Sequence, residues 1–220
     1  MTDSGLGRHG RLILVPAVIT LAVTLLRLTG ELLEWSSVFF NRSAGGGFAI
    51  VGIVWLIPIL GIYFGLRLTR AGDGPGKVLR ALGLVLLAFV LMPVVGFAAT
   101  AAGVDPNGIT MLLCFVVASV GAVLLAFSAW PALARVLVVY GLAARIPVAI
   151  VMLIAILANW GTHYDVPPPG FPEMAPLAKW FWIGFIPQMT IWIAFTVVVG
   201  MLFGLIAAAI VHRGRKSESA

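Results

Sequence analysis

The chain has 220 residues, of which 61% are hydrophobic and 10% are charged, and its mean hydropathy is +1.11. About a quarter of the residues of a soluble domain are charged, so this composition excludes an ordinary water-soluble protein and indicates a chain surrounded mostly by lipid. The net charge of +6 comes from basic residues at the ends of apolar segments, so it does not indicate a nucleic-acid partner.

Six apolar segments are long enough to span a bilayer, because a spanning helix needs about 20 residues. We expect helices over residues 12–35, 47–69, 78–101, 109–128, 132–159 and 178–211. Turn-forming residues separate them, and the longest separating stretch is the proline-rich loop 160–177. Residues 1–11 and 212–220 form short polar tails. The sequence therefore predicts an all-α integral membrane protein with six transmembrane helices in one bundle.

The distribution of basic residues predicts the sidedness of the bundle. If the N-terminus is cytoplasmic, ten of the 14 lysines and arginines fall on that side, two on the opposite side and two inside spans. We therefore expect both tails in the cytoplasm, the proline-rich loop outside, and the aromatic rings of Trp130 and Tyr140 at the inner interface. Arginine outnumbers lysine eleven to three, which favours a GC-rich bacterium and its cytoplasmic (inner) membrane.

The first span carries one polar stripe. Five of its polar side chains fall within an arc of about 80° at helical periodicity, namely Thr20, Thr24, Arg27, Glu31 and Glu34. Charges at membrane depth are costly unless they are paired or wetted, so the stripe should face the bundle interior or a water-filled cavity. We expect Arg27 to pair with Glu31, with Glu34 sharing the same arginine. Either a proton- or cation-binding carboxylate or a structural ion pair fits this pattern.

Arg145 lies near the middle of the fifth span, with no acidic residue in its own helix. An isolated charge at this depth needs a partner, and the candidates are Glu31, Glu34 or a bound anion. The alternative is that the side chain snorkels to the cytoplasmic surface. In the last span, Pro187 is followed at once by Gln188, which is a further candidate for binding.

Prolines and glycines inside the spans predict kinks and close packing. Pro58, Pro93, Pro147 and Pro187 each remove one helical hydrogen bond, which either kinks the helix or frees a carbonyl for an ion. The spacings Gly61-x-x-x-Gly65 and Gly200-x-x-x-Gly204 provide small faces on two helices. These faces favour tight packing, and they also fit a homodimer or a partner membrane subunit.

The proline-rich loop follows Asn159 and contains the sequence His163-Tyr164-Asp165. These side chains suggest a proton shuttle, but a metal ion would need Glu31 or Glu34 to complete its ligands, so no metal or cofactor is predicted. The three consecutive prolines favour a stiff, extended cap over the bundle. A function for His163 and Asp165 therefore depends on whether Glu31 and Glu34 lie beneath them.

The chain has no P-loop, G-x-S-x-G, H-E-x-x-H or C-x-x-C motif and only one cysteine, Cys114, which argues against known ATPases, zinc proteases and thiol enzymes. Three other functions fit the features above. The leading hypothesis is a small permease or channel-like protein that moves protons, ions or a small solute along the polar stripe, with Arg145 and Gln188 opposite. A less favoured alternative is a membrane-embedded enzyme that acts on a lipid or quinone at the outer interface. The third is an accessory or scaffold subunit of a membrane complex.

Overall fold

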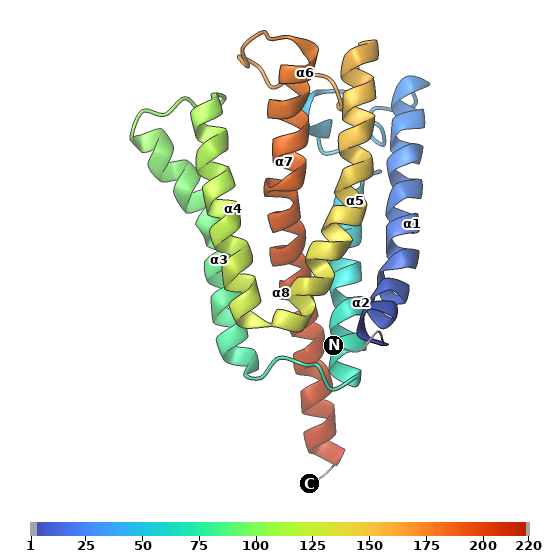
Figure 1. Ribbon diagram of the computed structural model, residues 1–220, viewed down its shortest axis with the longest axis vertical. Helices are drawn as coiled ribbons and strands as arrows, with labels where there is room; N and C mark the ends of the chain where they lie inside the picture. Colours follow the sequence, from blue (N-terminus) through green and yellow to red (C-terminus); the bar gives the residue numbers. More distant parts are fainter. Residues whose placement is uncertain (1–3, 219–220) are drawn as a thin grey trace.

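The computed structural model describes residues 4–218. This part of the chain is built from helices joined by loops and contains no strand (Figure 1). Residues 1–3 and 219–220, which belong to the two expected tails, lie outside the described residues. Both ends of the described chain lie at the lower end of the bundle in Figure 1, which we call the terminal end. The opposite end carries the segments 33–52 and 159–175, and we call it the loop end.

The long helices follow one another in an up-and-down order (Figure 1). The first five are α1 Ser4–Leu32, α2 Leu56–Arg70, α3 Val78–Ala101, α4 Ile109–Ala129 and α5 Pro131–Ala158. The last long helical segment is divided into α6 Pro176–Lys179, the π-helical segment η3 Trp180–Phe185, α7 Ile186–Met189 and α8 Ile191–Glu218. Two short 3-10 turns, η1 Ala44–Gly46 and η2 Ile53–Trp55, precede α2.

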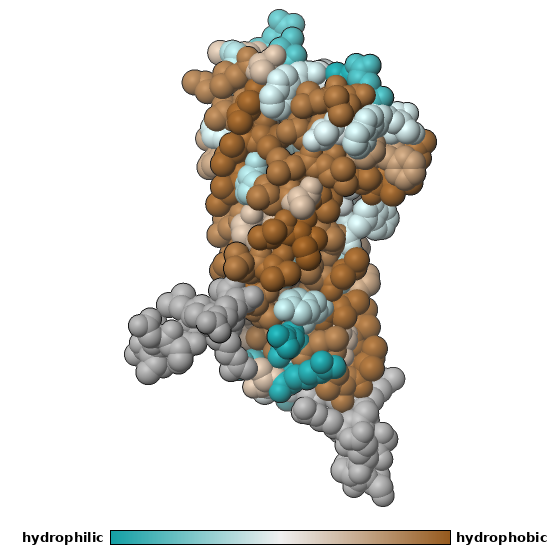
Figure 2. All heavy atoms as spheres, turned by 90° about the vertical axis from the view of Figure 1, so that its right-hand side faces the viewer, coloured by the Kyte–Doolittle hydropathy of each residue, from teal (hydrophilic) through white to brown (hydrophobic). Residues whose placement is uncertain are grey.

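Six helical segments among the described residues are long and apolar enough to cross a membrane. They are Leu12–Leu32, Ile53–Arg70, Val78–Ala101, Ile109–Ala129, Pro131–Ala158 and Pro176–Val211. Apolar side chains cover the middle of the face in Figure 2, whereas polar side chains gather toward its two ends. This distribution is the one that a bilayer favours, and the structure confirms the expected all-helical fold with six helices long and apolar enough to span a membrane.

The second helix begins at Ile53, later than the residue 47 expected from hydropathy. Gly45, Gly46, Gly47 and Phe48 all have positive φ, at 70°, 79°, 50° and 57°. A right-handed helix requires negative φ at each residue, so this stretch forms a folded loop instead. The loop therefore lies at the loop end, where its backbone carbonyls are available to side chains of α1.

Two pairs of glycines bring α2 and α8 into backbone contact. A Cβ on Gly65 would lie 2.6 Å from the Cα of Gly204, and Gly61 faces Gly200 one turn away. Contacts this close are possible only without side chains, which confirms the tight packing expected from the two glycine spacings. Because these glycines are used inside the chain, they give no support to a dimer, and the oligomeric state stays a prediction.

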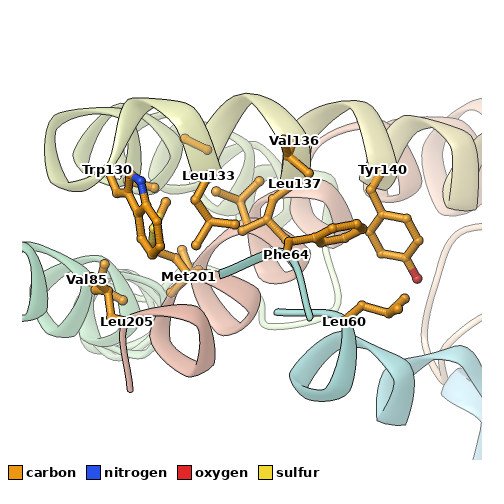
Figure 3. Packing of buried hydrophobic residues seen from close by; sticks show 14 of the residues in the cluster. Leu60, Phe64, Val85, Trp130, Leu133, Val136, Leu137, Tyr140, Met201 and Leu205 are labelled. Atoms are coloured by element: carbon orange, nitrogen blue, oxygen red, sulfur yellow. The ribbon is translucent and has the colours of Figure 1, made fainter. Parts of the chain in front are cut away.

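The terminal half of the bundle is filled by an apolar cluster to which α2, α3, α4, α5 and α8 contribute (Figure 3). Phe64, Leu133, Leu137 and Met201 are fully buried in it. Tyr140 closes the cluster on the side facing the loop end, with its hydroxyl directed away from the packed apolar side chains. This cluster seals the part of the bundle below the polar residues.

The expected interface positions of Trp130 and Tyr140 are wrong, because each side chain is only 1% exposed. The indole nitrogen of Trp130 donates to the Asp73 carbonyl at 2.7 Å, which ties the α4–α5 turn to the α2–α3 loop. The ring of Tyr140 packs against Phe64 at 5.6 Å between centroids. Both rings bury their apolar faces and satisfy their polar atoms inside the protein, which is as favourable as an interface position.

The glycine contact predicts a position-specific cost of added volume. The substitution Gly65→Ala should lower the free energy of unfolding by about 1–3 kcal/mol, because the new methyl group forces α2 away from α8. The matched control is Gly83→Ala on α3, where an added Cβ would meet nothing within 4 Å. Gly83→Ala should leave stability unchanged or raise it by up to about 1 kcal/mol. Unfolding of both variants in detergent measures this difference, and equal losses of stability would contradict it.

Candidate functional site

Arg27 and Glu31 form a buried ion pair on the last turns of α1. The two residues are spaced i, i+4, and the Arg27 Nε donates to Glu31 Oε1. The side chain of Arg27 is 7% exposed and that of Glu31 is 0% exposed. The pairing expected from the sequence is confirmed, and it removes much of the cost of burying either charge alone.

The guanidinium of Arg27 also binds the 33–52 loop through backbone carbonyls. Nη1 donates to the Val51 carbonyl at 2.5 Å, and Nη2 donates to those of Asn41 and Gly46 at 2.8 and 3.1 Å. Glycine is required at position 46 because φ is +79° there, and because a Cβ would lie 2.9 Å from Arg27 Nη2. Arg27 therefore holds together the end of α1 and three separate points of the loop.

The carboxylate of Glu31 binds the second loop through His163. The backbone N–H of His163 donates to Glu31 Oε2 at 2.9 Å, and the imidazole Nδ1 lies 2.5 Å from Oε1. The His163 side chain is 21% exposed, and its Nε2 makes no hydrogen bond with any other residue whose side chain is described. His163 thus links a completely buried carboxylate to the surface of the protein.

Tyr164 lies beneath His163 and extends the polar contacts toward α1. Its ring centroid is 3.9 Å from that of the imidazole, and its hydroxyl donates to the Thr24 carbonyl at 3.3 Å. Burial, followed by the nearby Glu31 carboxylate, raises the pKa of the Tyr164 phenol. The phenol therefore stays protonated and serves as a hydrogen-bond donor inside the bundle.

The other two candidates in this loop shape its backbone. Asp165 is buried, and its carboxylate accepts hydrogen bonds from the backbone N–H groups of Gly161 and Thr162 and from the Thr162 hydroxyl, at 2.7–2.8 Å. Asn159 ends α5 in the left-handed conformation, with φ at 52°. Asp165 is directed into its own turn and not toward Glu31, so the structure joins only His163 and Tyr164 to the α1 stripe.

Glu34 departs from the expected stripe. The helix α1 ends at Leu32, and Glu34 has a φ of 54°, which turns its side chain away from Glu31. Its carboxylate, whose side chain is 74% exposed, pairs with Arg42 Nη1 at 2.6 Å. The expectation that Glu31 and Glu34 share Arg27 is therefore wrong, because each carboxylate has its own arginine.

Two threonines continue the polar stripe toward the middle of α1. Thr20 Oγ1 lies 2.7 Å from Tyr140 Oη of α5, and it also donates to the Pro16 carbonyl at 2.8 Å. Thr24 Oγ1 donates to the Thr20 carbonyl at 2.9 Å. Both threonines are buried, so the face of α1 that was expected to be polar is directed into the bundle and packs on α5.

Arg145 lies apart from the acidic residues. Its Nη1 is 3.5 Å from Gln188 Oε1, and its Cζ lies 4.7 Å from the centre of the Trp192 ring. Within residues 12–211 the ion pairs involve Arg27, Arg42 and His163 but not Arg145. Of its candidate partners, Glu31 and Glu34 do not pair with Arg145, because Glu31 is bound by Arg27 and His163 and Glu34 by Arg42.

Three residues that were not predicted as site residues complete these contacts, namely Tyr140, Trp192 and Arg42. Tyr140 had been expected at an interface, but its hydroxyl lies inside the bundle against Thr20 of α1. Trp192 shares a helical face with Gln188, four residues earlier. No pattern pointed to the Arg42 contact with Glu34, because both residues lie in irregular backbone.

The residues that came together do not form a metal site. Within the described part of the chain, no three His, Cys, Asp or Glu side chains lie close enough to hold a metal ion. Comparison of the chain with protein-family models, with curated proteins and with solved structures finds no match. Function is therefore inferred from the chemistry of the side chains described above.

The two arginine–carboxylate pairs predict different costs for the same substitution. Glu31→Gln should lower the free energy of unfolding by about 3–5 kcal/mol, because it leaves the buried Arg27 without a counter-charge. Glu34→Gln should cost about 1 kcal/mol or less, because that pair is exposed to solvent. Denaturant titration of both purified variants in detergent measures the difference. Similar midpoints for Glu31→Gln and Glu34→Gln would show that the buried pair does not stabilise the fold.

Proposed function

We propose that this chain is a six-span protein of a bacterial cytoplasmic membrane, with both tails in the cytoplasm and the loop end outside. The excess of basic residues near the terminal end supports this orientation.

We further propose that the protein is a small permease that moves protons, or a solute together with protons, along the polar face of α1. The observation that carries this proposal is the contact between His163 and Glu31. A proton that arrives at the partly exposed imidazole can reach a carboxylate that is 0% exposed, across only 2.5 Å. A buried carboxylate with one route to the surface is the usual arrangement of a proton-binding site in a membrane protein.

Polar groups continue below this contact at intervals of about one helical turn. Tyr164 lies closest to the loop end, and Thr24, Thr20 and Tyr140 follow toward the middle of the bundle. Their hydroxyls can donate and accept hydrogen bonds, so a solute or water that entered between α1 and α5 would find polar partners over this distance. Beneath them the apolar cluster closes the path toward the cytoplasm.

Alternating access would need one helix that moves against a rigid remainder. The glycine contacts lock α2 to α8, whereas α1 packs mainly on α5 and exposes much of its surface. We therefore assign the movement to α1. A tilt of α1 relative to α5 would separate Thr20 from Tyr140 and open the lower part of the path without disturbing the α2–α8 contact.

The proposed orientation predicts which loops react with an impermeant reagent. In a Cys114→Ala background, cysteine is introduced by Ser37→Cys at the loop end or by Gly76→Cys at the terminal end. A membrane-impermeant maleimide applied to intact spheroplasts should label the Ser37→Cys variant, and should label the Gly76→Cys variant only after permeabilisation. The reverse pattern would invert the proposed topology.

The permease proposal predicts proton movement that depends on Glu31 and His163. Purified protein in liposomes that contain a pH-sensitive dye should dissipate an imposed pH gradient when potassium and valinomycin set the membrane potential. We expect Glu31→Gln to reduce this flux by about tenfold or more, as for loss of an essential proton-transfer group. Glu34→Gln, the matched control on the exposed pair, should retain wild-type flux.

A second variant separates proton transfer from folding. His163→Asn places an amide where the imidazole Nδ1 lies, so it can keep the hydrogen bond to Glu31 but cannot take up a proton. We expect a folded variant with reduced flux. Wild-type flux in both His163→Asn and Glu31→Gln would overturn the mechanism.

One observation also favours an enzyme as a second candidate. Glu31 orients Nδ1 of His163 and leaves Nε2 without a partner among the described residues, as in a carboxylate–histidine general base. Such a base could activate water against a lipid or quinone near the outer interface. Incubation with native lipids followed by mass spectrometry tests this: a product formed by wild type and lost in His163→Asn would favour the enzyme over the permease.

A further inference from the structure

The guanidinium of Arg145 is buried near the middle of α5 and has no carboxylate partner among residues 12–211. Arg145 is the fifteenth of the 28 residues of α5, and only 4% of the residue is exposed. A positive charge in such a position is unfavourable unless a negative charge or several hydrogen-bond acceptors compensate it. The position of Arg145 therefore requires an explanation that the proposed path along α1 does not give.

The protein satisfies only one side of this guanidinium. Nη1 faces Gln188 Oε1 at 3.5 Å, which is the long limit of a hydrogen bond, and the Trp192 ring covers the flat face of the group. Nε is buried without a partner, and Nη2 forms no hydrogen bond within residues 12–211. The edge formed by Nε and Nη2, which can bind a carboxylate side-on, is thus unused.

No acidic group of the described chain is available to fill that edge. The ionisable side chains near Arg145 are the phenols of Tyr140 and Tyr164, and neither is a carboxylate. Tyr140 is hydrogen-bonded to Thr20, and Tyr164 donates to the Thr24 carbonyl. Glu31 is already bound by Arg27 and His163. An anion that neutralises Arg145 must therefore come from outside this part of the chain.

The helix that faces Arg145 is irregular at the same level. The π-helical segment η3 ends just before Gln188, and Thr190 interrupts the helix with φ at −123° and ψ at −73°. The amide of Gln188 contacts two side chains of α5: its Nε2 lies 3.6 Å from the Met152 sulfur, and its Oε1 faces Arg145. π-helical segments and interrupted membrane helices recur at ligand sites, because they leave backbone and side-chain groups free to bind.

Trp192 separates Arg145 from the surface of the bundle. Its ring is half-buried, and the adjacent Phe195 is exposed on the same helix. A rotation of this single indole would uncover the flat face of the guanidinium and open a way to it from that side. The nearby α5 residues Ala144, Val148 and Met152 are buried and apolar, so the surroundings of Arg145 on this helix suit an apolar group next to one negative charge.

We propose that Arg145, Gln188 and Trp192 form a binding site for a monocarboxylate. The planar guanidinium matches a carboxylate in a two-bond, side-on contact, and one positive charge neutralises one negative charge. A phosphate dianion would leave excess charge in apolar surroundings. The carboxylate can belong to a small water-soluble acid or to a fatty acid from the membrane. This site does not depend on proton movement through Glu31 and His163.

Equilibrium binding to the full chain in detergent tests the site directly. The probes are radiolabelled propionate for the water-soluble source, radiolabelled decanoate for the fatty-acid source, and inorganic phosphate as the control anion. We expect saturable binding of one carboxylate per chain. If decanoate binds and propionate does not, the natural ligand is a fatty acid from the membrane. Phosphate should not compete. Failure of both propionate and decanoate to bind would overturn the proposal.

Variants then assign the binding to the guanidinium. Arg145→Met keeps much of the volume, removes a buried unpaired charge and should fold well, yet it should weaken binding by about 10- to 100-fold. Arg145→Lys keeps the charge without the fork and should weaken binding measurably. Arg135→Met, at an exposed position of the same helix, is the matched control and should bind as wild type does.

If one of the two Arg145 variants fails to fold, the binding measurement on the other still tests the site. Unchanged binding in either folded variant would show that the carboxylate is held elsewhere. Glu31→Gln should retain carboxylate binding, so loss of proton flux in that variant without loss of binding would separate this site from the proposed path.

Discussion

The ion pair of Arg27 and Glu31 is the interaction on which the loop end depends. Arg27 fixes three carbonyls of the 33–52 loop, and Glu31 fixes the backbone and the ring of His163 in the 159–175 loop. Neither loop has a regular ladder of its own to satisfy these backbone groups, so the charged pair supplies partners to both loops, beside the turn that Asp165 holds within its own loop.

The two halves of the bundle are stabilised by different kinds of interaction. Near the terminal end, apolar side chains and glycine contacts pack α2, α5 and α8 closely, and close packing of this kind resists rearrangement. Near the loop end, hydrogen bonds and charges hold α1 to both loops. A structure that is rigid at one end and polar at the other is suited to binding or moving a polar solute from one side.

Helical periodicity made part of the site predictable, because it fixes the relative directions of side chains along α1. It correctly joined Arg27 to Glu31 and directed Thr20 and Thr24 into the bundle. It failed at Glu34, because α1 ends where the loop docks on Arg27, and that docking is a tertiary contact. The isolation of Arg145 was equally hidden, since it depends on which residues had already bound Glu31.

The spacing of Arg27 and Glu31 has a further consequence for how the protein is made. The two charges lie four residues apart in one helix, so their bond can form before any later helix of the chain exists. The segment can then enter the bilayer with its charges mutually neutralised, which reduces the cost of inserting two separate ions. The carbonyls that complete the hydrogen bonds of Arg27 follow 14–24 residues later in the chain. The ribosome therefore makes the ion pair before it makes the loop that binds to it.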